Sequence, residues 1–154
     1  MKTINNFGIW GNTDKKSFWD LLPSLLIWAK KNNLEAYITT RIKSHPNAIN
    51  LKNQVIESSN EFEKLDFILS LGGDGTFLSL ARALGKYSTP ILGVHLGDLG
   101  FLAKVVLSDI YTRLNQILSG DSFLERRMLA KASISYSGKT KSFIALNDFV
   151  FSNG

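Results

Sequence analysis

Strand-length apolar runs alternate with helix-length segments over the first two-thirds of the chain, and this alternation constrains the fold more than any other feature. Four apolar runs have the length of buried strands, namely residues 6–11, 36–40, 66–71 and 90–94. Residues 17–32 show the i, i+3, i+4 and i+7 apolar spacing of an amphipathic helix, and residues 77–84 predict another helix. The polar residues 43–63 indicate loop and helix. Strands that alternate with helices favour a parallel α/β sheet covered on both faces, which we assign to residues 1–103.

The pattern changes beyond this α/β unit. Residues 108–119 predict a further helix, because their apolar side chains fall on one face. From Ala130 apolar and polar residues alternate, residues 137–138 are a turn signal, and a second run follows over 142–151, which together predict a β-hairpin. We therefore expect residues 104–154 to form a connecting helix and the first strands of an incomplete all-β domain.

Composition excludes several kinds of chemistry. The 154 residues include no cysteine, which excludes disulfides, zinc–thiolate sites, iron–sulfur clusters and thiol catalysis, and which fits a reducing, cytoplasmic location. The net charge of +5 comes from scattered lysines and arginines, so we expect no nucleic-acid partner. No apolar run approaches the ~20 residues that span a bilayer, so we expect no membrane partner. A positive protein suits an anionic ligand such as a nucleotide.

A glycine-rich loop follows the third apolar run. Three of the four residues Gly72-Gly73-Asp74-Gly75 are glycines, so the backbone can approach a bulky anion without interference from Cβ atoms. A loop between a strand and a helix also directs free N–H groups of the helix start at that anion. The pattern predicts a phosphate site formed by Gly72, Gly73, Gly75 and Thr76.

Asp74 is the unexpected residue of this loop, because a carboxylate repels phosphate. Two arrangements resolve the conflict: Asp74 shares a Mg²⁺ ion with the phosphates, or it accepts the proton of an attacking hydroxyl. Either arrangement indicates phosphoryl transfer. The structural alternative is a tight turn in which Asp74 or Thr76 caps the helix.

Two further segments carry unusual residues. Glycines at 93, 97 and 100 follow the fourth apolar run and indicate either a loop that lines the same crevice or a plain connector. Asn147 and Asp148 interrupt an apolar strand, where both residue types are depleted. Asp148 could accept from both hydroxyls of a ribose and Asn147 could bind a base edge or an amide; alternatively, the pair marks a bulge or a strand end.

Four segments in this order resemble the ATP-NAD kinase family. They are residues 71–78 with Arg82, then 90–94, then Leu99-Gly100-Phe101-Leu102, and then Ala145-Leu146-Asn147-Asp148. Diacylglycerol and sphingosine kinases also carry the Gly-Gly-Asp-Gly segment, whereas the last two segments favour NAD kinase. The resemblance implies a Rossmann-like sheet followed by a β-rich domain.

The same resemblance implies an activity and a set of residues. The family transfers a phosphoryl group from ATP, with Mg²⁺ or another divalent cation, to the 2′-hydroxyl of the adenosine ribose of NAD, giving NADP. Asp74 is then the catalytic base, and Asp74, Gly75, Asn147 and Asp148 contact NAD. Phe77, His95 and Gly97 are candidate ligand-lining residues, although the family usually has asparagine where this chain has His95. We leave the metal ligands open, with Asp74 as a candidate beside the phosphates.

The family also continues well beyond the matched segments, with the rest of a β-rich domain and further NAD contacts. We therefore expect this chain to be a fragment with weak or no activity alone, and the full-length protein to form homo-oligomers. Two other hypotheses stay open: a stand-alone nucleotide-binding or regulatory module, and a lipid kinase of the diacylglycerol kinase type.

Overall fold

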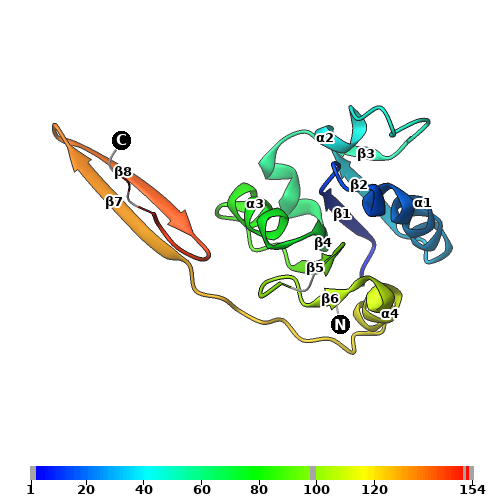
Figure 1. The fold of residues 1–154 in the computed structure, drawn as a ribbon. Coiled ribbons are helices and arrows are strands. Elements are labelled where there is room, and N and C mark those ends of the chain that lie inside the picture. The colour runs from blue at the N-terminus through cyan, green and yellow to red at the C-terminus, as the bar shows by residue number, and fades with distance from the viewer. Residues whose placement is uncertain (1–2, 98–99, 151, 153–154) are drawn as a thin grey trace.

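A computed structural model, which describes residues 3–97, 100–150 and 152, contains one parallel sheet and one hairpin (Figure 1). The strands of the sheet are β1 (Asn6–Gly11), β2 (Glu35–Thr39), β3 (Gln54–Ile56), β4 (Phe67–Gly72), β5 (Ile91–His95) and β6 (Val105–Val106). They lie in the order β3-β2-β1-β4-β5-β6, and every neighbouring pair is parallel. The α/β fold expected from the sequence is confirmed.

Helices cover both faces of the sheet (Figure 1). They are α1 (Lys16–Lys31), α2 (Thr40–Lys43), α3 (Asp74–Leu84) and α4 (Ile110–Ser119), with the short 3-10 helices η1 (Ser59–Lys64) and η2 (Leu107–Asp109). One apolar core includes the buried sides of α1 and α4, and another includes those of α3 and η1. Successive β4 residues alternate between the two cores: Leu69 belongs to the first and Ile68 to the second.

The predicted hairpin is confirmed, with a shorter second strand than the sequence indicates. β7 (Ala130–Tyr136) pairs antiparallel with β8 (Lys139–Ala145). Ser137 and Gly138 join them with φ angles of 50° and 73°, the two positive values that a tight type I′ turn requires. The second strand was expected to reach residue 151, which lies outside the described residues, but β8 ends at Ala145. Its partner Ala130 is the first residue of β7, so the ladder of hydrogen bonds stops there.

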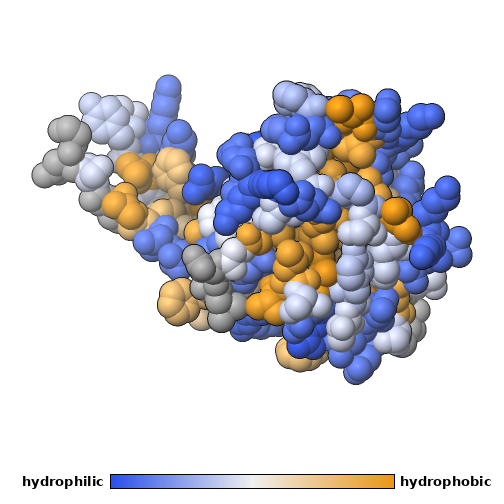
Figure 2. Space-filling model, turned by 45° about the vertical axis from the view of Figure 1, so that its right-hand side comes forward, coloured by the Kyte–Doolittle hydropathy of each residue, from blue (hydrophilic) through white to orange (hydrophobic). Residues whose placement is uncertain are grey.

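The hairpin lies apart from the sheet at the end of an extended segment (Figure 1). Most of its side chains are exposed, and apolar groups are visible on its surface (Figure 2). The exposed large apolar or aromatic side chains of β7 and β8 are Ile134, Tyr136, Phe143 and Ile144. Among the residues that the structure describes, no helix has the length and apolar character needed to cross a membrane.

Candidate active site

The main cleft lies where the strand order reverses. β1 and β4 are neighbours at the centre of the sheet, and the chain continues outward from them in opposite directions. In open α/β sheets, ligands bind beyond the carboxyl ends of the strands at such a point. A cleft of about 820 Å³ opens there, a volume within the range of about 300–1,000 Å³ that is usual for small-molecule sites. Its walls come from the loops after β1, β2, β3 and β4.

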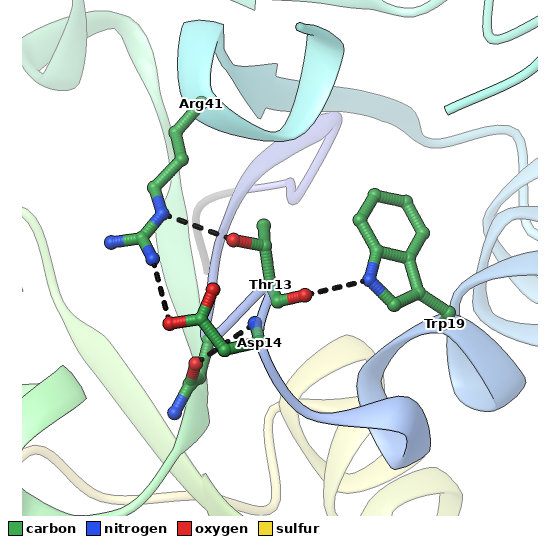
Figure 3. Close-up of polar contacts among 5 residues, drawn as sticks. Thr13, Asp14, Trp19 and Arg41 are labelled. Carbon is green, nitrogen blue, oxygen red and sulfur yellow. Dashed lines mark hydrogen bonds and ion pairs between the residues drawn. The ribbon is translucent and has the colours of Figure 1, made fainter. Parts of the chain in front are cut away.

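Arg41 fixes the loop between β1 and α1 at one wall of this cleft (Figure 3). Its Nε donates to Thr13 Oγ1 at 3.0 Å, and its Nη2 pairs with Asp14 Oδ2 at 3.1 Å. On the other side of the loop, Trp19 Nε1 donates to the Thr13 carbonyl at 2.8 Å. Thr13 is therefore bonded from two directions and only 3% exposed, so the loop has a defined shape.

A second cation lines the cleft at Lys15. Its Nζ lies only 2.9 Å from the position that a Cβ atom would take on Gly97, so the ammonium group rests beside the glycine loop that follows β5. Lys15 and Arg41 bring two cations to the cleft, whose lining also includes the carboxylates of Asp14 and Glu57. Sequence reasoning missed both residues, although each follows the carboxyl end of a strand, which is the signal that could have identified them.

The predicted phosphate loop divides into an open part and a buried part. Gly73, Gly75 and Thr76 line the cleft, and a Cβ atom on either glycine would meet nothing within 4 Å. Gly72 is buried, because the Thr76 side chain packs within 2.2 Å of its would-be Cβ position. α3 begins here, and the N-terminus of a helix favours an anion. The open residues can therefore hold a phosphate group.

Asp74 lies at the start of α3, and its carboxylate binds a segment far along the chain. Oδ2 accepts from Phe101 N at 2.9 Å, and Oδ1 accepts from Leu102 N at 3.0 Å and Ala103 N at 3.3 Å. Gly73 is the N-cap residue of α3 and no side chain caps the helix, so the alternative in which Asp74 or Thr76 acts as the cap is wrong. The carboxylate is held by amides from outside its own helix.

These hydrogen bonds lower the pKa of Asp74. The backbone N–H of Phe101 is the largest cause, and the N–H groups of Leu102 and Ala103 add to it against the opposing effect of desolvation. A lowered pKa keeps the group ionised through the neutral and mildly acidic range. The hydrogen bonds to Asp74 therefore stabilise the folded state at any pH above the ordinary pKa of an aspartate. This stabilisation is lost as the pH falls through the lowered pKa of Asp74 in the folded protein.

We expect a carboxyl-carbon NMR titration of Asp74 to give a midpoint below the ordinary value of 3.8. The reason is that protonation removes acceptor capacity that three amides use. In urea-unfolded protein the same carbon should titrate at its ordinary value. A folded-state midpoint at or above the unfolded one would contradict the role of these amides.

Two candidate ligand-lining residues lie in the interior. His95, at the end of β5, is 2% exposed, and its Nε2 accepts from Gly100 N at 2.9 Å. Phe77 is 8% exposed and packs against Gly93. Gly97 is exposed beside Lys15. Of the segment that resembles the family here, Leu99 lies outside the described residues.

Asn147 and Asp148 lie beyond the end of β8, as the strand-end alternative proposed. Both are exposed, and Asn147 Nδ2 donates to Asp148 Oδ1 at 3.4 Å. They share a small hollow of about 80 Å³ with Arg82 and other residues of α3. The structure thus brings the pair to the side of the helix that begins at Asp74, and Asp74 is not among the residues that line this hollow.

Metal-ligating side chains do not gather in the described part of the chain. Within residues 3–97, 100–150 and 152, no three His, Asp or Glu side chains are close enough together to hold an ion. Both oxygens of Asp74 are already engaged by amides.

Comparison with known proteins gives one consistent family. Residues 7–122 match the model of the ATP-NAD kinase N-terminal domain. An NAD kinase of Clostridium botulinum (strain Loch Maree / Type A3) is 35% identical over 151 residues, which are 98% of this chain and 50% of the relative. An NAD kinase of Thermoanaerobacter sp. (strain X514) is 32% identical over 152 residues, 98% of this chain and 53% of the relative.

The fold has a solved counterpart in the yeast NADH kinase complexed with NADH. That structure superposes with a TM-score of 0.77 at 16% identity, covering 94% of this chain and 47% of the yeast chain. This chain spans about half the length of the curated relatives that it matches. The fold, the glycine-rich loop and the similarity over 98% of the chain all indicate the same family. The chain belongs to the ATP-NAD kinase family and matches the amino-terminal domain of that family.

Proposed function

We propose that the protein carrying this chain transfers the terminal phosphoryl group of ATP to the 2′-hydroxyl of the adenosine ribose of NAD, giving NADP. The observation that carries the proposal is the ionised Asp74 carboxylate at the start of α3, next to a cleft lined by Gly73, Gly75 and Thr76. A phosphate loop with a carboxylate at its centre suits transfer to a hydroxyl better than passive binding.

The large cleft is proposed to hold ATP. Lys15 and Arg41 line this cleft together with Gly73 and Gly75 at the start of α3, and their positive charge suits the triphosphate. Trp10 lines the same cleft and is only partly buried, so its ring offers an apolar face that suits the adenine ring, while the buried Phe62 packs against it with ring centroids 6.2 Å apart.

Asp74 is proposed to bind the acceptor hydroxyl and to take its proton. The transition state of phosphoryl transfer is loose, so the hydroxyl proton leaves late and orientation contributes more than a strong base would. A carboxylate with a lowered pKa fits this role, because at neutral pH it is ionised and can accept the hydroxyl hydrogen. One of the hydrogen bonds that backbone N–H groups donate to the carboxylate would lengthen as the substrate hydroxyl enters.

The divalent cation is proposed to bind mainly to the phosphates of ATP. Mg²⁺ commonly keeps several waters and uses one or two carboxylates together with substrate phosphates. Asp14 and Glu57 line the cleft and could contribute oxygen ligands, whereas the amide-bound Asp74 suits this role less. The cation would neutralise phosphate charge during the transfer.

The remaining expectations concern NAD and the whole protein. Asn147 and Asp148, with Gly75, are proposed to contact NAD, since their amide and carboxylate match amide and hydroxyl groups. The full-length protein is proposed to form homo-oligomers, which light scattering would test. A cytoplasmic location agrees with the absence of cysteine from the sequence.

The direct test incubates the protein, as its gene encodes it, with NAD, ATP and Mg²⁺ and detects NADP with an NADP-specific dehydrogenase. We expect NADP only when all three are present. The isolated 154-residue chain should form far less, because both nucleotides must be positioned together. No NADP from the full-length protein, or phosphorylation of diacylglycerol in its place, would overturn the proposal.

We expect Lys15→Ala and Arg41→Ala each to raise the KM for ATP about 10-fold, the usual effect of losing a charged hydrogen bond, and to leave the KM for NAD almost unchanged. Lys16→Ala is the matched control, since Lys16 neighbours Lys15 but is 88% exposed and pairs with Asp20. Equal effects at Lys15 and Lys16 would remove Lys15 from the ATP site. Steady-state kinetics with each substrate varied in turn makes the measurement.

A further inference from the structure

His95 occupies a buried position next to the residues that carry Asp74. It ends β5, and the register of the parallel pair places it opposite Gly72, which ends β4 two residues before Asp74. The side chain is 2% exposed. An imidazole at this point cannot reach solvent, so its effect must pass through the atoms that it contacts.

His95 accepts a hydrogen bond from the first of four consecutive backbone N–H groups. Its Nε2 accepts from Gly100 N at 2.9 Å, and the next three N–H groups, from Phe101 to Ala103, all donate to the Asp74 carboxylate. Four successive backbone donors are thus shared between His95 and Asp74. For Nε2 to accept, the imidazole must be neutral with its proton on Nδ1.

Gly100 shows how closely the segment fits against Asp74. A Cβ atom at Gly100 would lie 2.3 Å from Asp74 Oδ1, so the Gly100 backbone packs directly against the carboxylate. A small slide of the segment would therefore change the position of the carboxylate itself. The bond from Gly100 to His95 fixes the end of the segment that is nearest to that contact.

A buried imidazole at this position destabilises the folded state relative to an apolar ring. Its Nδ1 is buried and has no hydrogen-bond partner among the described residues, which disfavours the folded state. An apolar ring of similar size would pack here without that cost. The imidazole must therefore contribute something that packing does not, and the acceptor at Nε2 is the available candidate.

We infer that His95 is a positioning residue, which holds Gly100 so that the amides of residues 101–103 set the place and orientation of the Asp74 carboxylate. The inference rests on the proposed function only where it concerns turnover. Its structural part, that His95 determines how tightly the segment binds Asp74, is independent of the reaction.

The kinetic test compares His95→Phe with His95→Gln in the protein as its gene encodes it. Phenylalanine keeps a ring and removes the acceptor, whereas the glutamine Oε1 reaches approximately the place of Nε2. We expect His95→Phe to lower kcat about 100-fold, the effect of a displacement of about 1 Å at a reacting group, with both KM values nearly unchanged. His95→Gln should recover most of that loss. Equal losses in both variants, or a rise in KM alone, would overturn the inference.

A second readout does not depend on activity. Amide hydrogen exchange at residues 101–103 should be faster in His95→Phe and close to wild type in His95→Gln. His45→Leu is the matched control, because His45 stacks on Trp19 and has no bond to this segment in the described structure. Unchanged exchange in a folded His95→Phe variant would overturn the inference even if NADP forms. Absence of NADP with the expected exchange pattern would overturn only the proposed function.

A measurement on the unaltered protein remains if His95→Phe does not fold. Nitrogen-15 NMR of the imidazole should show a neutral ring with the proton on Nδ1 and a hydrogen-bonded, unprotonated Nε2. A ring with its proton on Nε2 could not accept from Gly100 and would overturn the inference.

Discussion

Asp74→Asn will lower kcat for NADP formation about a thousandfold, within the range for loss of a positioned general acid or base. Two changes at the site cause this loss of rate. The variant has no carboxylate to receive the hydroxyl proton. It also presents an NH₂ group to a site where Oδ1 and Oδ2 both accept backbone N–H groups, so one donor faces another.

The measurement is single-turnover and steady-state kinetics on purified protein, with NADP quantified enzymatically. Asp20→Asn is the control, because Asp20 is exposed and its contact in the structure is a surface pair with Lys16. The control should keep its full rate. A wild-type rate for Asp74→Asn would remove Asp74 from the reaction.

Leu69→Ala will lower the free energy of unfolding by about 3–4 kcal/mol, a typical value for a large apolar side chain removed from a core. Leu69 is fully buried at the middle of β4 and pairs in register with Ile9 of β1 and Leu92 of β5. The substitution leaves a cavity at Leu69. Because β4 is hydrogen-bonded to β1 on one side and to β5 on the other, these strands cannot move in to fill that cavity.

Urea denaturation followed by circular dichroism checks this value, with an unchanged slope against urea as a sign that the unfolded state is unaffected. Ile27→Ala is the control, since Ile27 on α1 is 58% exposed. Its effect should stay within about 0.5 kcal/mol. A loss below about 1 kcal/mol at Leu69 would mean that the side chains of α1 and α4, which share its core, repack to fill the space.

Local patterns in the sequence were enough to predict most of the fold. The apolar run before Gly72 gave β4, the amphipathic spacing over residues 17–32 gave α1, and the turn at residues 137–138 gave the hairpin. Each signal lies within one element and depends on burial of one face. Gly73, Gly75 and Thr76 could be assigned to a site for the same reason, because a loop between a strand and a helix defines it locally.

Features that depend on distant residues could not be predicted. β3 is an edge strand in a polar stretch, and it exists because Tyr37, Ile38 and Thr39 of β2 pair with it. The amides that hold Asp74 come from residues 27 to 29 positions further on. No spacing rule connects Asp74 to Phe101, or Arg41 to Thr13. These contacts form only when the sheet has assembled and has brought the carboxyl ends of its strands to the same edge.

The segment between α4 and β7 has a practical consequence. Residues 121–129 have neither helix nor strand, most of their side chains are exposed, and they form an extended segment that joins α4 to the hairpin (Figure 1). Arg126 and Arg127 lie within it. Exposed extended chain is what a protease needs, so trypsin under native conditions will cut here first and release the α/β unit as a resistant product.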